Sequence, residues 1–353
     1  MYSTVNTEFS RASAPRSADC VPTLIVVVDT EEEFDWSAPF DHHADAVTNI
    51  AMQPLAQEIM DRHGVVPTYV VDYPVANSMI AAQILAPIAD RGGCEIGAHL
   101  HPLVNPPHEN VVDEFHSFPG NLPPELEFEK LALLQDRIVS ELGAKPTIYK
   151  AGRYGIGPST FATLVRLGFR IDVSVVPHTD FSSVHGPDFT SFPTGPFRPS
   201  PELLALPLSV HFVGALSQAG RTIHPIVTSK LGRHARVGTV LSRLGILERL
   251  RLSPEGHSLA DMKRQTLVAL ARGERYFMMT YHSSSLLPGA NPYVRSEHDR
   301  QKFLGTIDGY FAFFRRDCEG RTRSVSAFAE SASFDADAPS SVRNSPNGST
   351  ITR

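Results

Sequence analysis

Two histidines one residue apart are the clearest candidates for chemistry in this sequence. His99 and His101 lie in the segment CEIGAHLH (residues 94–101), whose apolar residues predict a β-strand. Side chains at positions i and i+2 of a strand point to the same face, about 6 to 7 Å apart. One metal ion with nitrogen bonds of about 2.0 to 2.1 Å can bind both imidazoles. The spacing therefore predicts two ligands of a metal site.

A run of acidic residues supplies carboxylates for such a site. The β-branched segment TLIVVV (residues 23–28) predicts a buried strand and stops at Asp29, in the sequence DTEEEFDW. A carboxylate from this run would complete a three-ligand site with an open position for water. A second carboxylate would then be free to accept a proton from that water. The competing interpretation is a solvated acidic loop.

Polar residues accompany three further predicted strands. His282 follows the segment YFMMTY, Lys150 and Arg153 lie at the end of another strand, and Asp172 lies in the next one. Histidine can protonate a leaving atom, and lysine or arginine can orient a carboxylate or steer an anionic substrate. Together with the acidic run and the histidine pair, five strands carry polar groups, which favours one shared site.

The elements that position these residues alternate between strand and helix. The predicted strands are residues 23–28, 65–72, 94–101, 147–151, 170–176, 203–208 and 276–281. The predicted helices are residues 45–62, 78–91, 124–142, 159–167, 259–272 and 297–315. This alternation predicts an α/β fold with a parallel sheet, either open or closed into a barrel. In both folds the chemistry lies at the carboxyl ends of the strands.

Composition and motifs exclude several classes of protein. The chain has 353 residues, of which 42% are hydrophobic and 20% charged, and its formal net charge of −6 argues against a broadly basic nucleic-acid binder. Three cysteines far apart exclude a disulfide framework. The nucleophile elbow, the P-loop and the dinucleotide fingerprint are missing. The polar first twenty residues and the lack of a long apolar run predict a cytoplasmic protein without a membrane-spanning segment.

The chain divides into one domain and two terminal segments. We expect a flexible segment at residues 1–20, the α/β domain at residues 21–330 and a disordered tail at residues 331–353. A basic insertion at about residues 209–256 precedes the last strands. Between residues 220 and 255, seven Lys or Arg face two acids. That insertion is either a solvated surface or a patch that attracts a phosphorylated substrate or an anionic membrane surface.

The order of the motifs resembles that of the polysaccharide deacetylase (NodB-homology) superfamily. The similarity runs over residues 24–285. It is carried by the segments VDTEEEFDW, EIGAHLHP with NPP, AGRYGIGP and YHSSSLLPG. These segments look most like the WalW-type branch. The resemblance implies a distorted, partly irregular (β/α) barrel. It also implies a divalent metal, usually zinc, and hydrolysis of an N-acetyl or sometimes an O-acetyl group on a sugar.

The resemblance also implies roles for individual residues. Asp29 is similar to the general base of the family and Glu31 to its carboxylate ligand. His99 and His101 are similar to the histidine ligands, and His282 to the catalytic acid.

Further roles concern the orientation of the base and the binding of substrate. Arg153 or Lys150 would orient the base. The backbone N–H of Tyr154 would stabilise the oxyanion. We expect Asp172 to belong, with Tyr154, to the residues that contact the substrate or the oxyanion.

The sequence departs from the family pattern at three places, and each leaves an alternative. Glu33 shares a face with Glu31 on an extended chain and is a rival ligand. The usual H-x-x-x-H is shortened to H-x-H, so His108 is a rival to His101. Lys150 stands where an arginine is usual and cannot form a bidentate fork with a carboxylate.

The expected function is that of a zinc-dependent deacetylase acting in the cytoplasm. Its partner would be an acetylated sugar or glycan intermediate in the assembly of lipopolysaccharide or another surface polysaccharide, and not a nucleic acid. Contact with a membrane would be peripheral. Two alternatives remain: a metal-dependent amidohydrolase for a small non-sugar amide, and a non-catalytic relative that binds sugar or metal.

Overall fold

The computed structural model describes residues 10–11, 21–34, 38–108, 111–229, 234 and 237–331. The strands are β1 (Ser10–Arg11), β2 (Thr23–Thr30), β3 (Thr68–Val71), β4 (Glu95–Leu100), β5 (Ile148–Ala151), β6 (Ile171–Asp172), β7 (Phe197–Ser200), β8 (Leu203–Ala205), β9 (Val210–Val213), β10 (Glu248–Arg251), β11 (Tyr276–His282) and β12 (Arg321–Thr322). The α-helices are α1 (Gln53–His63), α2 (Tyr73–Ala76), α3 (Met79–Asp90), α4 (Pro124–Leu142), α5 (Thr160–Arg166), α6 (Gly220–Thr228), α8 (Val237–Arg243), α9 (Leu259–Ala271), α10 (Glu297–Arg316) and α11 (Val325–Ser331). The 3₁₀ helices are η1 (Thr48–Met52), η2 (Phe115–Ser117), η3 (Pro119–Asn121), η4 (Gly152–Tyr154), η5 (Ser182–Val184), η6 (Ser217–Ala219) and η7 (Ser283–Leu286).

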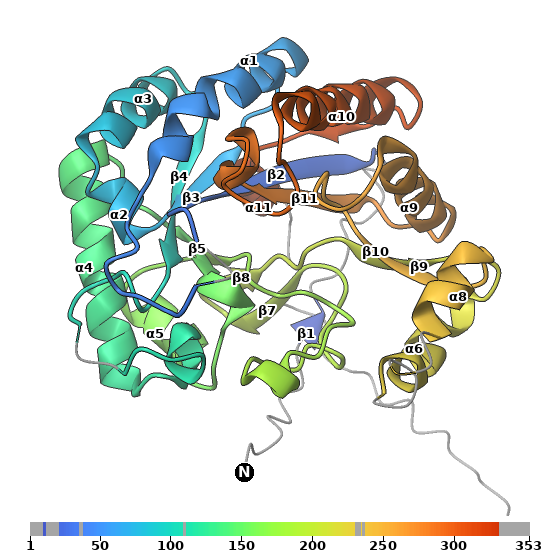
Figure 1. Cartoon of the computed structure of the whole chain (residues 1–353), viewed down its shortest axis with the longest axis horizontal. Coiled ribbons are helices and arrows are strands. Elements are labelled where there is room, and N and C mark those ends of the chain that lie inside the picture. The colour runs from blue at the N-terminus through green and yellow to red at the C-terminus, as the bar shows by residue number, and fades with distance from the viewer. Residues whose placement is uncertain are drawn as a thin grey trace, which may run out of the picture.

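The main sheet is parallel over most of its width. Within the described part of the chain, seven neighbouring strands run parallel in the order β8-β6-β5-β4-β3-β2-β11. β12 pairs with β2 in parallel, whereas β7 and β1 extend the opposite edge antiparallel. The long helices lie around the outside of the curved sheet (Figure 1). The result is a curled, incomplete (β/α) barrel, which confirms the predicted fold class.

Each predicted element has an observed counterpart, although several are shorter than predicted, such as β3 (predicted at residues 65–72) and β8 (predicted at residues 203–208). The predicted helix at residues 124–142 is α4, with the same ends. The predicted helix at residues 45–62 is divided into η1 and α1. The predicted strand at residues 170–176 is reduced to β6, because Ser174 turns back to bond with Asp172 instead of continuing the ladder.

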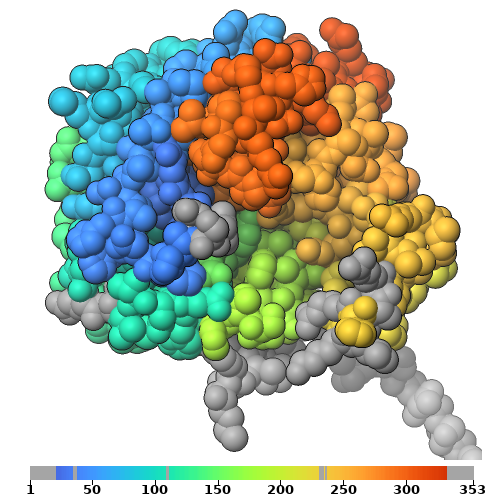
Figure 2. All heavy atoms as spheres, in the orientation of Figure 1, coloured from blue at the N-terminus to red at the C-terminus, as the bar shows by residue number. Residues whose placement is uncertain are grey.

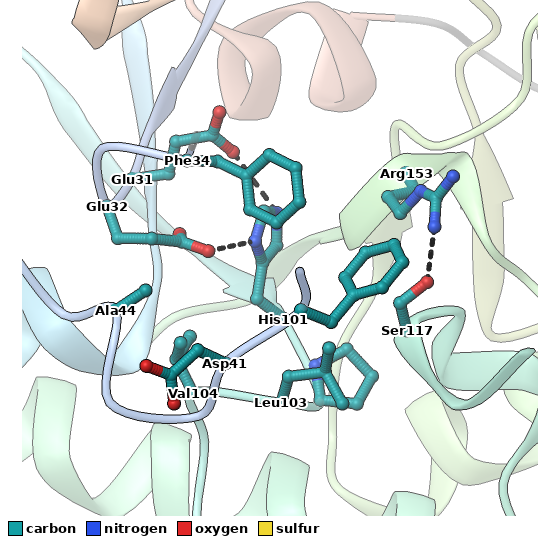
Figure 3. A pocket seen from close by; sticks show the side chains of 12 residues that line it. Glu31, Glu32, Phe34, Asp41, Ala44, His101, Leu103, Val104, Ser117 and Arg153 are labelled. Atoms are coloured by element: carbon teal, nitrogen blue, oxygen red, sulfur yellow. Dashed lines mark hydrogen bonds and ion pairs between the residues drawn. The ribbon is translucent and has the colours of Figure 1, made fainter. Parts of the chain in front are cut away.

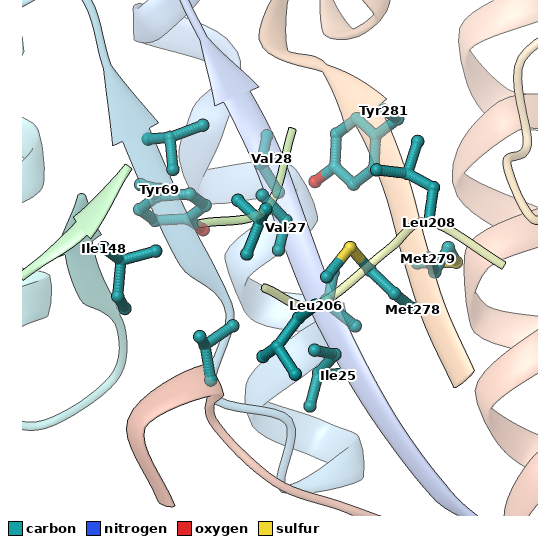
Figure 4. Packing of buried hydrophobic residues seen from close by; sticks show 14 of the residues in the cluster. Ile25, Val27, Val28, Tyr69, Ile148, Leu206, Leu208, Met278, Met279 and Tyr281 are labelled. Carbon is teal, nitrogen blue, oxygen red and sulfur yellow. The ribbon is translucent and has the colours of Figure 1, made fainter. Parts of the chain in front are cut away.

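Strand β2 is the centre of the hydrophobic core. All of its residues are buried, as expected for a parallel strand that is covered on both faces. Ile25 and Val28 belong to the same buried cluster as Tyr69 of β3 and Met278 of β11 (Figure 4). This packing fixes the carboxyl end of β2, where Asp29 lies.

The basic insertion covers one edge of the barrel. Its strands β9 and β10 form an antiparallel pair, and α6 and α8 lie between them in the chain. The Met278 N–H of β11 donates to Ser209 Oγ (2.8 Å), and the Thr280 N–H donates to the Leu252 carbonyl (3.2 Å). The insertion therefore lies against the edge of β11 that faces away from β2.

The terminal segments are described only in part. Ser10–Arg11, within the predicted flexible segment, pair with β7. The predicted tail lies outside the described residues, apart from the last residue of α11. No helix among the described residues combines the length and the apolar character needed to cross a membrane.

Candidate active site

The carboxyl ends of β2, β4, β5 and β11 meet at one face of the sheet. In the parallel registers His282 lies opposite Asp29, and His99 lies opposite Lys150. Segments from the first, middle and last thirds of the chain meet on this face (Figure 2). The strand pairing thus brings together side chains that are far apart in the sequence.

Glu31, His99 and His101 form the most compact cluster of metal-ligating side chains in the described part of the chain. Glu31 Oε2 lies 3.0 Å from His99 Nε2 and 3.1 Å from His101 Nε2. The two Nε2 atoms are 3.0 Å apart. Figure 3 shows the carboxylate of Glu31 directed at the ring of His101. Three donor atoms therefore converge on one point.

The outer nitrogens of both imidazoles are held by fixed acceptors. His99 Nδ1 donates to the Lys150 carbonyl (3.0 Å), and His101 Nδ1 donates to Glu32 Oε1 (2.8 Å). These bonds leave both Nε2 lone pairs facing each other and Glu31, so a proton or a cation must lie between them. Imidazoles oriented through Nδ1 are typical of metal ligands. The three residues therefore fit a divalent metal.

Gly152 permits the close approach of His101 to strand β5. A Cβ atom at this position would lie 2.4 Å from His101 Cδ2 and 2.6 Å from the Leu100 carbonyl oxygen. Any other residue would displace the imidazole. The glycine in the segment AGRYGIGP therefore has a packing role in the candidate metal site.

The charges in the triad favour a cation. Burial alone would raise the pKa of Glu31, but His282 and His101 hold it well below its usual range. Burial alone would lower the pKa of His101, but Glu32 and Glu31 raise it well above its usual value. The same carboxylates that favour an imidazolium favour a bound metal ion.

A second buried carboxyl group supports Glu32 from behind. The Glu32 N–H donates to Asp72 Oδ2 (2.7 Å), and Asp72 Oδ1 accepts from the Val75 N–H at the start of α2. Burial and the neighbouring Glu32 raise the pKa of Asp72 well above its usual range. Of the two carboxyls, Asp72 therefore takes up a proton more readily, which favours a negative charge on Glu32 beside His101.

Asp29 is held by a buried ion pair rather than by the triad. Lys150 Nζ donates to both carboxylate oxygens, at 2.5 and 2.7 Å, and to Thr280 Oγ1 at 3.1 Å. Lys150 is fully buried. His282 Nε2 lies 3.5 Å from Asp29 Oδ2. The lysine thus fixes the orientation of Asp29 beside both His282 and the triad.

His282 is positioned by Glu255, a buried residue at the end of the insertion. Glu255 accepts from His282 Nδ1 (2.9 Å), from the His282 N–H (2.9 Å) and from Ser285 Oγ (2.6 Å). Burial alone would lower the pKa of His282, but Glu255 first, then Glu31 and Asp29, raise it to about 10. The ring is therefore protonated at neutral pH, and its Nε2–H faces Asp29 and Glu31.

The site opens into a cavity of about 380 Å³. Asp29, Glu31, His99, His101 and His282 all line it. Aromatic residues form much of the remaining wall: Phe34, Phe118, Tyr154, Phe181 and Tyr293. The volume suits a small ligand or one sugar unit, and the aromatic faces suit the apolar faces of a sugar ring.

Arg153 lines the cavity but does not contact Asp29. Its guanidinium donates to Ser117 Oγ (Figure 3), lies 3.4 Å from Glu114 and stacks on the ring of Phe118 at 4.2 Å. Its φ of 54° turns the chain away from the end of β5. Of the two cations considered for orienting Asp29, Lys150 is the one in contact with it.

Tyr154 lies in the cavity wall, whereas Asp172 does not. The Tyr154 ring faces Lys150 Nζ at 5.1 Å, and its hydroxyl accepts from Arg251 (2.8 Å). Asp172 accepts from Ser174 through both its Oγ (2.6 Å) and its N–H (3.2 Å). Burial raises the pKa of Asp172 to about 7. This carboxyl therefore supports the turn after β6 and is not among the residues that line the cavity.

The two rival ligands lie outside the triad. Glu33 Oε1 accepts from Thr48 Oγ1 (2.7 Å) and from the Asn49 N–H (2.8 Å), so it supports the start of η1. The ring of His108 stacks on His42, with 5.3 Å between the ring centroids. The geometry therefore favours Glu31 over Glu33 and His101 over His108.

Glu32, Glu255 and Arg251 were not singled out by the sequence pattern. Glu32 lies in the run of acids. On an extended chain its side chain points to the opposite face from Glu31 and Glu33, so it was not expected beside the metal ligands. Glu255 and Arg251 lie in the insertion, where no periodic pattern predicted strand β10. The only available signal was the charge of this segment.

Comparisons with known proteins bear on the fold. Searches of family models and of curated proteins give no match. A candidate polysaccharide deacetylase from Mycobacterium smegmatis has a TM-score of 0.52 and 16% identity, covering 92% of this chain and 94% of its own. A family 4 acetyl xylan esterase from Clostridium thermocellum, in complex with a cobalt ion, has a TM-score of 0.41 and 11% identity, covering 87% and 90%. The first similarity shows that this chain has the polysaccharide deacetylase fold.

Proposed function

We propose that this chain is a metal-dependent hydrolase that removes an N-acetyl or O-acetyl group from a sugar of a surface polysaccharide or lipopolysaccharide intermediate. The observation that carries the proposal is the convergence of Glu31, His99 and His101 beside a separately held Asp29 and His282. The sugar and the WalW-type branch rest on the sequence resemblance. Zinc is the metal we expect, because two imidazoles and one carboxylate are a common zinc ligand set.

Glu31 Oε2, His99 Nε2 and His101 Nε2 would hold the metal. When bound, a divalent cation polarises a carbonyl oxygen and makes water a stronger nucleophile at neutral pH. Glu32 and the Lys150 carbonyl keep both imidazoles in the orientation that binding requires. Glu33 is hydrogen-bonded to Thr48 and Asn49, and Asp29 and His282, which also lie near Glu31, are held by Lys150 and Glu255.

Asp29 and His282 divide the proton transfers between them. The Asp29 carboxylate accepts a proton from the attacking water, with Lys150 holding it in place. The protonated His282 donates a proton to the departing nitrogen or oxygen, and Glu255 orients its ring. Acetate and the free amine or hydroxyl are the products.

The proposal is tested by acetate release from acetylated sugars by zinc-loaded protein. We expect turnover that is lost on chelation and restored by zinc. His282→Gln separates the acid from the other roles: its loss should be larger on amides than on activated esters, whose leaving groups need little protonation. Equal turnover of the wild type, Asp29→Asn and His282→Gln on a confirmed substrate would overturn the mechanism. Turnover of small non-sugar amides alone would favour an amidohydrolase.

A further inference from the structure

Strand β10 presents different chemistry on its two faces. Glu248 and Leu250 lie on one face, where Leu250 is buried and Glu248 pairs with Arg264 of α9. Arg249 and Arg251 lie on the other face, because side chains two residues apart in a strand point the same way. That face is directed at the wall of the cavity.

Arg251 lines the cavity and has neutral hydrogen-bonding partners. It donates to the Tyr154 hydroxyl at 2.8 Å. The charges of Glu255 and, more weakly, Asp29 act on it, but Glu255 is hydrogen-bonded to His282 and Ser285, and Asp29 is ion-paired with Lys150. No carboxylate of the described residues lies within ion-pair distance of this guanidinium.

Arg249 extends the positive charge behind Arg251. It is partly buried and donates to Thr179 Oγ1 at 2.6 Å, and it too lacks an acidic partner within 4 Å in the described part of the chain. Burial, and then the neighbouring Arg251, lower the pKa of Arg249 to about 10, so it stays a cation at neutral pH. Burial and Arg249 also lower the pKa of the nearby His224 to about 4.

Arg249 and Arg251 are two neighbouring, partly buried guanidiniums, and each donates to a neutral hydroxyl group. Moving an ionised group out of water costs several kcal/mol unless an opposite charge compensates it. An arginine cannot lose its proton to avoid this cost. A negatively charged group that enters the cavity beside Arg251 would supply an ion-pair partner that the described residues do not provide.

We propose that the substrate carries an anionic group, a phosphate or a carboxylate, on or next to the acetylated sugar, and that Arg251, backed by Arg249, binds it. This inference rests on the proposed function for the reaction itself. The acetyl group would lie toward Asp29 and His282, and the anion toward β10, with the aromatic walls between them. A guanidinium matches both anions through paired N–H donors.

The test compares matched sugars with zinc-loaded protein. The probes are N-acetylglucosamine, its 1-phosphate, and the corresponding N-acetylated uronic acid. We expect kcat/KM to be higher for one of the charged sugars than for the neutral one. Arg251→Gln and Arg249→Gln should each lower the ratio of kcat/KM for the charged sugar to kcat/KM for the neutral sugar about 10- to 100-fold. The phosphate and the carboxylate arms identify which anion is bound.

Arg243→Gln is the matched control, because Arg243 is an exposed arginine of the same insertion outside the cavity wall. It should leave the preference for the charged sugar unchanged. Arg251→Lys keeps the charge but loses the fork, and should recover part of the preference. Equal losses on charged and neutral sugars in the Arg249 and Arg251 variants would overturn the inference, as would a wild type without preference.

Calorimetric binding separates this inference from the proposed reaction. If no probe releases acetate, the hydrolase proposal fails. The anion site is still supported if a charged sugar binds more tightly than N-acetylglucosamine and Arg251→Gln loses this binding. If acetate is released but charge changes neither binding nor turnover, the anion site fails and the hydrolase proposal stands. Absence of binding by any probe overturns the anion site.

Discussion

The metal triad and strand β10 border the same cavity but differ in how their charges are compensated. In the triad, Glu31 faces two imidazoles, and the outer nitrogen of each imidazole has its own acceptor. On β10, Arg249 and Arg251 donate only to hydroxyl groups. The triad is thus preorganised by the protein itself, whereas β10 is complete only with a negatively charged ligand. Under the two proposals, the triad belongs to the reaction itself, and Arg249 and Arg251 determine which substrate is bound.

The largest expected effect is loss of the metal from the triad. His99→Ala and His101→Ala each remove one of three converging donors, so we expect neither variant to retain stoichiometric zinc after dialysis and both to lose acetate release. Metal analysis and activity assays check this. Glu31→Gln should behave in the same way, and Glu33→Gln is its matched control, because the Glu33 carboxylate accepts from Thr48 and Asn49 and lies outside the triad. Retention of zinc by Glu31→Gln together with its loss from Glu33→Gln would assign the ligand to Glu33.

Asp29→Asn should slow the reaction without removing the metal. The amide cannot accept a proton from water, so we expect kcat to fall about 10²- to 10⁴-fold. It also leaves the buried Lys150 without an anionic partner, so the melting temperature should fall as well. Zinc content, kcat and melting temperature are measured on the same preparation. Loss of zinc from this variant would exchange the roles of Asp29 and Glu31.

Glu255→Gln tests whether the insertion positions the catalytic acid. We expect kcat on amides to fall about 10²-fold, because the ring of His282 loses its ionised partner. The ionised Glu255 raises the pKa of His282, so its removal lowers that pKa and moves the alkaline limb of the kcat profile to lower pH. Ser285→Ala removes one hydrogen bond to Glu255 but no charge and should leave the limb in place. An unchanged limb in Glu255→Gln would give Glu255 a purely structural role.

The smallest effect concerns a buried charge far from the cavity. Glu127 of α4 accepts from Thr160 and Ser159, and burial raises its pKa from 4.5 to about 7. Between about pH 4.5 and pH 7 the folded state therefore holds a proton that the unfolded state releases. The contribution of Glu127 to the free energy of unfolding is complete below about pH 4.5 and is lost as the pH rises through 7. Glu127→Gln should raise the free energy of unfolding at pH 8 by about 1 to 3 kcal/mol and flatten its dependence on pH.

Denaturant titrations at pH 5 and pH 8 measure this difference. A steeper dependence on pH in Glu127→Gln would contradict it. A buried carboxyl without a cation, such as that of Glu127, can become neutral by binding a proton. Arg249 and Arg251 stay charged at neutral pH, because a guanidinium does not lose its proton.

Much of the metal site was predictable because buried strands have a strong local signal. TLIVVV fixes where β2 ends, and parallel pairing brings its carboxyl end beside those of β4 and β11. The same-face spacing of His99 and His101 then predicts two converging imidazoles. Residue types and spacing, with no knowledge of contacts, were sufficient for these steps.

The remaining parts of the site depend on how the chain turns after a strand ends. Arg153 has a positive φ and donates to Ser117, and Asp172 accepts from Ser174. The residue types and spacing predict neither of these two contacts. Arg251 reaches the cavity, and the buried Glu255 reaches His282, because the insertion packs against β11. That packing is tertiary, so a pattern local to the sequence does not predict it.

The pairing of β2 with β11 also determines when the site can form during synthesis. Glu31 and Ser283, which share a hydrogen bond, are 252 residues apart. At about 5 to 20 residues per second, the ribosome needs about 13 to 50 s to make the chain between them. Until Lys150 has been made, the acidic end of β2 lacks both Lys150 and His282. After that it lacks only His282, so the nascent chain has the carboxylates of the candidate site before it has this histidine. The candidate site is therefore complete only after β11 has been synthesised.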